Sequence, residues 1–96
     1  MTQGEEKIYD RMRVFGRVQR VLFRDTARRR AKGLGLVGYV RNAQDGSLEI
    51  IAAGAKERVA ELFDWAKRGP IFARVDRYEI NTVSFPEVFN DFIIKY

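Results

Sequence analysis

Cysteine and histidine are both absent from the sequence. Their absence excludes disulfide bonds, a thiolate nucleophile and a phosphohistidine, and it removes the two residue types on which most zinc sites depend. Only oxygen ligands remain for a metal ion, and the sequence contains no closely spaced group of carboxylates. We therefore expect no metal and no cofactor, and any catalysis must depend on arginine, asparagine, serine, threonine, carboxylates or backbone amides.

Long hydrophobic runs are missing as well. No apolar segment approaches the roughly 20 residues of a membrane-spanning helix, and the N-terminal MTQGEEKIYD lacks the apolar core of a signal peptide. The 96 residues, of which 46% are hydrophobic and 32% charged, have the size and composition of one small globular domain. We expect a cytoplasmic monomer without membrane contact, in which residues 8–96 form the domain and residues 1–7 a flexible tail.

Acidic residues are scarce over one third of the chain. Residues 11–42 contain nine arginines and Lys32 against a single acid, Asp25, so this segment carries +9 while the rest of the chain carries −4. Such an asymmetry is typical of a focused positive field and an anionic partner. Taken alone, it fits a solvated helix face with charged edge strands equally well.

Hydrophobic periodicity predicts the element order β-α-β-β-α-β, followed by a short further strand. Strands are expected at 8–15, 36–42, 47–53, 73–85 and 92–96, with the turn signal Asp45-Gly46 between the second and third. Right-handed crossovers convert this order into an antiparallel sheet with both helices on one face, the ferredoxin-like α+β sandwich.

Two apolar stripes at helical spacing mark the helices. The first consists of Phe23, Ala27, Ala31 and Leu34 and ends at Gly33 and Gly35, and the second consists of Val59, Leu62, Phe63 and Ala66 and ends at Gly69-Pro70. Phe23, Phe63 and Phe92 are expected in the core. Trp65 lies off the second stripe, and we expect it to be partly exposed.

The loop at residues 16–22 joins the first strand to the first helix and is the candidate anion site. A helix N-terminus presents unpaired backbone N–H groups at the positive end of its dipole, which favours phosphate. Arg24 follows at the helix start, and a guanidinium grips two phosphate oxygens at once. Asn42 precedes the hairpin turn; on the residues alone, the better interpretation is a turn residue that bonds its own backbone.

The motifs GRVQRVLFR and LGLVGYVRNAQDGSLEI, followed by GPIFARVDRYEI and a terminal FIIKY, resemble those of the acylphosphatase family. The family signatures read G-R-V-Q-G-V-x-F-R and G-x-V-x-N-x-x-D-G-x-[VL]-E, and the similarity extends from Met12 to Tyr96. The resemblance implies the ferredoxin-like fold and an enzyme that hydrolyses the carboxyl–phosphate bond of small acyl phosphates, without metal or covalent intermediate, to carboxylate and inorganic phosphate.

The resemblance also implies roles for individual residues. Arg24 and Asn42 are the expected catalytic residues: Arg24 holds the phosphate and Asn42 positions the attacking water. The backbone amides of the loop are expected to bind the phosphate together with Arg24; they belong to Gln19, Arg20, Val21, Leu22 and Phe23.

Arg20 and Leu22 depart from the family pattern: the family has glycine at the position of Arg20, and commonly glycine or a small residue at the position of Leu22. If residue 20 has a positive φ, an arginine there costs roughly 1–2 kcal/mol of strain. If residue 20 has a negative φ, its backbone amide is unharmed, and its side chain either adds positive charge at the rim of the loop or folds over the cradle and blocks it. The alternative function is therefore a non-catalytic phosphate-binding domain of the same fold.

A more remote alternative is an RNA-binding module of the same topology. Such a module stacks bases on aromatic side chains of its central strands. The predicted third strand, SLEIIAA, contains no aromatic residue, so nucleic acid is an unlikely partner.

Overall fold

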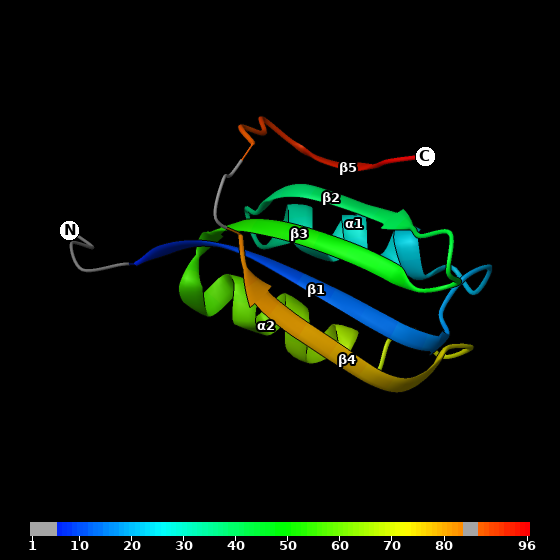
Figure 1. The fold of residues 1–96 in the computed structure, drawn as a ribbon. Coiled ribbons are helices and arrows are strands. Elements are labelled where there is room, and N and C mark those ends of the chain that lie inside the picture. The colour runs from blue at the N-terminus through cyan, green and yellow to red at the C-terminus, as the bar shows by residue number, and fades with distance from the viewer. Residues whose placement is uncertain (1–5, 84–86) are drawn as a thin grey trace.

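The computed structural model describes residues 6–83 and 87–96 (Figure 1). Its elements are β1 (Lys7–Arg17), α1 (Phe23–Gly33), β2 (Val37–Asn42), β3 (Leu48–Ala55), α2 (Lys56–Ala66), β4 (Arg74–Thr82) and β5 (Phe92–Ile94). The predicted order of elements is confirmed. No helix in the described part of the chain is long and apolar enough to cross a membrane.

The first strand extends beyond its predicted limits of 8–15. It includes Lys7, which pairs with Ala55 and so does not belong to a tail, and it runs on to Arg17. Residues 1–5 of the predicted tail, and residues 84–85 of the predicted fourth strand, lie outside the described residues.

The sheet has the strand order β4-β1-β3-β2-β5. The pairs β1–β4, β1–β3 and β2–β3 are antiparallel, as predicted, whereas β5 lies parallel to β2 with Phe92 opposite Gly38, so the complete sheet is mixed. Both helices cover the same face, and the other face is open (Figure 1).

The core fills the space between the sheet and the helices. Alternate strand residues such as Met12, Val14 and Ile50 are fully buried there, and α1 contributes the small side chains Ala27 and Ala31, which let the helix lie close to the sheet. The expectation that Phe23, Phe63 and Phe92 belong to the core is confirmed, since each is at most 3% exposed.

The prediction of a partly exposed Trp65 is wrong, because its side chain is only 7% exposed. The Phe23 ring meets the indole edge-on with centroids 5.3 Å apart, and the Arg30 guanidinium lies 5.0 Å from the indole centroid. Both partners belong to α1, so the two helices pack on one another as well as on the sheet. Periodicity measured against a sheet alone does not reveal this second neighbour.

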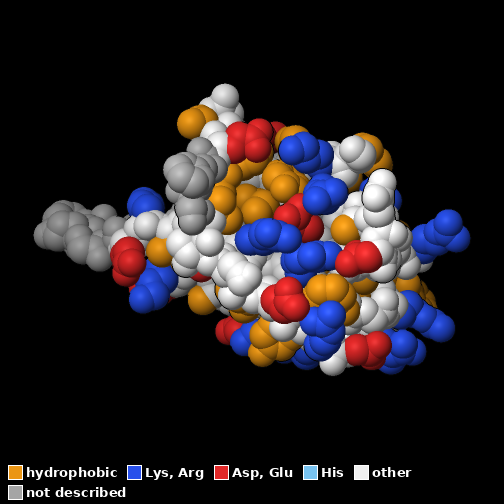
Figure 2. Space-filling view, in the orientation of Figure 1, with side chains coloured by type: hydrophobic (Ala, Val, Ile, Leu, Met, Phe, Trp, Pro, Cys, Tyr) orange, Lys and Arg blue, Asp and Glu red, His pale blue; other side chains and the backbone are white. Residues whose placement is uncertain are grey.

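Acidic and basic side chains lie intermixed on the open face of the sheet (Figure 2). This face is organised around Glu49, which is only 5% exposed. Its carboxylate forms ion pairs with Arg11 at 2.8 Å and Arg41 at 2.5 Å, and it accepts a hydrogen bond from the Tyr39 hydroxyl at 3.0 Å. Burial, together with this neighbouring carboxylate, raises the pKa of Tyr39. The fold thus places one carboxylate between two arginines, and the group retains a single net positive charge.

Gly38 lets β2 approach β3 closely, and the effect is testable. A Cβ at Gly38 would lie 2.0 Å from the Ile51 carbonyl oxygen, whereas a Cβ at Gly35 would meet nothing within 4 Å, although both residues have positive φ. We expect Gly38→Ala to lower the free energy of unfolding by about 3 kcal/mol or more, and Gly35→Ala by about 1 kcal/mol, in urea titrations. Equal losses would contradict the close approach.

Candidate active site

The loop between β1 and α1 contains two left-handed residues. Arg20 has φ 64° and Leu22 has φ 66°, and Leu22 is followed directly by the right-handed residues of α1. A left-handed residue followed by a right-handed one points successive N–H groups to the same side, which creates a concave anion site. Among the described residues, no backbone N–H from Gln19 to Phe23 has a backbone acceptor. The amides of this cradle are thus available to a ligand.

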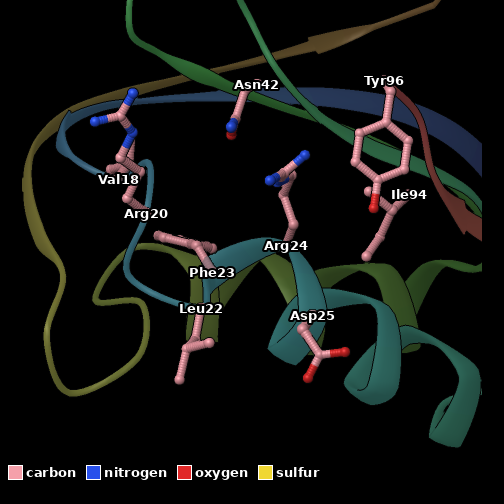
Figure 3. Close-up of a pocket in the computed structure, with 9 residues that line it drawn as sticks. All are labelled: Val18, Arg20, Leu22, Phe23, Arg24, Asp25, Asn42, Ile94 and Tyr96. Atoms are coloured by element: carbon pink, nitrogen blue, oxygen red, sulfur yellow. The ribbon is translucent and has the colours of Figure 1, made fainter.

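The left-handed backbone decides the question that the sequence left open at Arg20. An L-amino acid in this conformation costs roughly 1–2 kcal/mol, so Arg20 and Leu22 both store strain at the loop. The Arg20 side chain is exposed and lies on the opposite side of the cavity from the Arg24 guanidinium (Figure 3). It therefore stands at the rim and does not cover the cradle.

Arg24 lies in the first turn of α1, and its guanidinium points into the cavity (Figure 3). The guanidinium carbon lies 5.2 Å from the centroid of the Tyr96 ring. Its neighbour Asp25 is paired with Arg29 at 3.1 Å, and Arg24 forms no ion pair within the described part of the chain. The charge of Arg24 is consequently free to act on an anion.

Asn42 is the last residue of β2 and pairs with Leu48 of β3. Its Oδ1 atom is buried and has no hydrogen-bond partner among the described residues, so it does not bond its own backbone as a turn residue would. Asp45 performs that task instead, because its Oδ1 accepts hydrogen bonds from the Ser47 amide at 2.9 Å and the Ser47 hydroxyl at 2.5 Å. These bonds lower the pKa of Asp45.

The cradle, Arg24 and Asn42 meet at one cavity of about 400 Å³. Its lining residues are Val18, Arg20, Leu22, Phe23, Arg24, Asp25, Asn42, Ile94 and Tyr96. Arg24 and Asn42 point into the same space, whereas the side chains of Leu22 and Asp25 point away from it (Figure 3). Gln19 and Val21 belong to the same loop but do not line the cavity: Val21 packs against the core and the Gln19 side chain turns to the β2–β3 hairpin.

Sequence reasoning did not find Ile94 and Tyr96 at this cavity. They reach it because β5 adds to the sheet beside β2, where Ile94 is opposite Val40. Their positions depend on a strand pairing between residues far apart in the chain, for which the spacing of the motifs contains no signal.

Some of the positively charged residues of segment 11–42 form ion pairs, and others form none. On the open face of the sheet, Arg11 and Arg41 share Glu49, and Arg13 pairs with Asp45 at 2.7 Å. Around the cavity, Arg20 and Arg24 have no carboxylate partner among the described residues. Among the described residues, Arg17, Arg28 and Arg30 also form no ion pair, so the unpaired positive charge of the segment extends from the loop along α1.

Comparison with known proteins identifies the family of this chain. Residues 10–94 match the family model described as Acylphosphatase. The chain belongs to the acylphosphatase family. It is 48% identical to an acylphosphatase of Caldivirga maquilingensis over 87 residues, which are 90% of this chain and 92% of the relative.

Solved acylphosphatase structures have the same fold. The acylphosphatase from Coxiella burnetii superimposes with a TM-score of 0.87 at 30% identity, covering 99% of this chain and 100% of the other. The acylphosphatase from Bacillus subtilis gives 0.87 at 31% identity, covering 93% and 99%. The resemblance predicted from the motifs is thereby confirmed, and so is the ferredoxin-like fold class.

The strain at Arg20 has a measurable consequence for stability. Glycine adopts the left-handed conformation freely, and the 1–2 kcal/mol released exceeds the roughly 0.5–1 kcal/mol by which its unfolded-state entropy opposes folding. We expect Arg20→Gly to raise the free energy of unfolding by about 0.5–1 kcal/mol in urea titrations. The control Arg29→Gly, within α1, should lower it by about 1 kcal/mol. A destabilised Arg20→Gly variant would show that the arginine side chain stabilises the loop.

Proposed function

We propose that this member of the acylphosphatase family hydrolyses the carboxyl–phosphate bond of small acyl phosphates to a carboxylate and inorganic phosphate. The observation that carries the proposal is the meeting of an unpaired guanidinium, Arg24, and an unpartnered buried amide oxygen, that of Asn42, at one cavity beside the amide cradle. An anion holder and a water holder within one cavity are the two parts that such a hydrolysis requires.

Phosphate binding falls to Arg24 and the loop in this mechanism. The guanidinium donates two parallel hydrogen bonds to phosphoryl oxygens, and the N–H groups of residues 19–23 donate to the others. The dipole of α1 adds positive potential at the same point. Because these donors are fixed before the substrate arrives, they stabilise the charge on the phosphoryl oxygens as the bond to the acyl oxygen breaks.

Asn42 has the second role. Its Oδ1 accepts a hydrogen bond from a water molecule and orients the lone pair of that water toward phosphorus, in line with the leaving oxygen. The bond from water to phosphorus forms while the bond from phosphorus to the acyl oxygen breaks, and the electron pair leaves with the carboxylate. The two protons of the water stay on the phosphate product, which leaves as dihydrogen phosphate. A carboxylic acid with a pKa near 4–5, similar to that of glutamate, leaves without help from a general acid.

The proposed reaction uses neither metal nor cofactor. Cysteine and histidine are absent from the sequence, and the described residues contain no group of three or more potential metal ligands of the His, Cys, Asp or Glu type. Arg24 and the amide cradle supply the charge neutralisation for which other phosphoryl-transfer enzymes use Mg²⁺.

The alternative of a non-catalytic phosphate-binding domain depends on Arg20 and Leu22. The placement of both side chains outside the space between Arg24 and Asn42 favours the enzyme (Figure 3). A binding domain would be stabilised by inorganic phosphate and would leave acyl phosphate intact, so turnover separates the two functions.

Turnover of benzoyl phosphate, in the presence of a chelator and without added metal, is the deciding measurement. We expect Arg24→Ala and Asn42→Ala each to lower kcat/KM by about 10²–10³, because each removes a group fixed for the transition state. The control Arg29→Ala removes an arginine of the same helix that is paired with Asp25, and it should retain wild-type activity.

Three results would contradict the assignment. If the wild type shows no turnover and the Arg20→Gly variant does, the Arg20 side chain blocks the cradle. Activity that a chelator abolishes would contradict the metal-free mechanism. Equal activity of the wild type and Asn42→Ala would remove the proposed role of the amide.

The expected cytoplasmic location, monomeric state and lack of nucleic-acid binding stay predictions. The edge strand β4 supports the monomer, since its exposed residues include Arg74, Asp76, Arg77 and Glu79, and charges on an edge oppose pairing with another chain. Arg11 and Arg41 share Glu49, so this group on the open face offers a single net positive charge to nucleic acid.

The monomer prediction is tested by sedimentation equilibrium over a wide range of protein concentration. We expect the mass of one chain throughout, because both sheet edges are poor templates: β4 is charged and β5 has only three residues. A concentration-dependent mass would contradict it, and a charge-neutral β4 variant, Arg77→Ser with Glu79→Ser, would then show whether that edge is the contact.

A further inference from the structure

The Gln19 side chain connects two parts of the site that no single element holds together. Its Nε2 atom donates to the carbonyl oxygens of Ala43 at 2.9 Å and Ser47 at 3.0 Å. Both acceptors belong to the hairpin turn that begins directly after Asn42. One residue of the cradle loop thus fastens this loop to the neighbour of Asn42.

The hairpin turn is a firm point of attachment. Ser47 is only 1% exposed, its carbonyl also accepts the Ala43 amide at 2.8 Å, and its hydroxyl accepts a hydrogen bond from Arg13 of β1 at 2.9 Å. Arg13 also pairs with Asp45 at 2.7 Å. The turn is therefore fixed to the centre of the sheet, and Gln19 ties the loop to a rigid reference.

The loop itself has few other polar attachments. Its two left-handed residues are strained, and the Gln19 bonds are the hydrogen bonds that join residues 18–22 to the hairpin in the described part of the chain. The phosphate is held from this loop and the water from Asn42, so the loop-to-hairpin distance sets the alignment of water and phosphorus. An error of about 1 Å in such an alignment costs about 10²-fold in rate.

We propose that the Gln19 side chain is a positioning residue, which sets the phosphate cradle against Asn42 and so aligns the water with the phosphorus atom. This role rests on the proposed function. It acts through Asn42 and leaves the anion site intact, since Arg24 and the loop amides do not depend on the Gln19 amide group for their donors.

A double-mutant cycle tests the role in steady-state hydrolysis of benzoyl phosphate, with inorganic phosphate as competitive inhibitor. We expect Gln19→Leu to lower kcat about 10- to 100-fold while the inhibition constant of phosphate changes less than about 3-fold. In the Asn42→Ala background, the same substitution should lower kcat less than about 3-fold, because the water is no longer held. Gln44→Leu, at an exposed glutamine of the same hairpin turn, is the matched control and should leave all constants unchanged.

Gln19→Glu is the second variant. Glutamate has nearly the same shape as glutamine, so this variant tests the hydrogen bonds with less change in packing than leucine makes. Its ionised carboxylate has no donor for the two carbonyls, whereas the protonated form donates one hydrogen bond. We therefore expect its kcat at neutral pH to fall about 10- to 100-fold, as in Gln19→Leu, because the same two hydrogen bonds are lost.

Equal losses of kcat in both backgrounds would overturn the role, because Gln19 would then act independently of Asn42. Phosphate binding that weakens in parallel with kcat would also overturn it, because Gln19 would then shape the cradle alone. An active wild type with unchanged kcat in Gln19→Leu would overturn this inference and leave the proposed function standing. A wild type without turnover would overturn the proposed function before any variant is made.

Discussion

The central position of β3 is the constraint on which the site depends. Leu48, at the start of β3, pairs with Val14 of β1 on one side and with Asn42 of β2 on the other. Because both pairings are antiparallel, the C-terminal ends of β1 and β2 lie at the same end of the sheet, beside the first residue of β3. The loop that follows β1 and the asparagine that ends β2 are thereby brought together, although the residues between them form a whole helix.

The loop illustrates how a functional geometry overrides local preference. Two residues with ordinary side chains, Arg20 and Leu22, adopt the left-handed conformation that glycine adopts freely. The amides rather than the side chains form the cradle, so the side chains are free to vary as long as the backbone follows its path. The surrounding fold supplies the energy that holds this path, through the burial of Val18 and Phe23 on either side of it.

The sequence predicted local features well and long-range ones poorly. The periodicity of Phe23, Ala27 and Ala31 was sufficient for α1, and the motifs located Arg24 and Asn42, which the structure brings to one cavity. The ferredoxin-like fold was predicted too, whereas the parallel pairing of β5 with β2, the helix contact that buries Trp65 and the arrival of Tyr96 at the cavity each depend on residues distant in the chain. Such contacts are decided by which apolar faces fit together, and a single sequence contains no direct signal of that fit.

The unpartnered amides of the loop connect the concentration of a bound anion with the stability of the fold. The cradle exists only in the folded chain, so any anion that fills it shifts the folding equilibrium by mass action; at 100 times its dissociation constant the gain is about 2.7 kcal/mol. In the proposed function inorganic phosphate is the product, and the product therefore stabilises the protein that releases it. Abundance of this small domain would then follow the phosphate concentration of its surroundings, without any dedicated regulatory site.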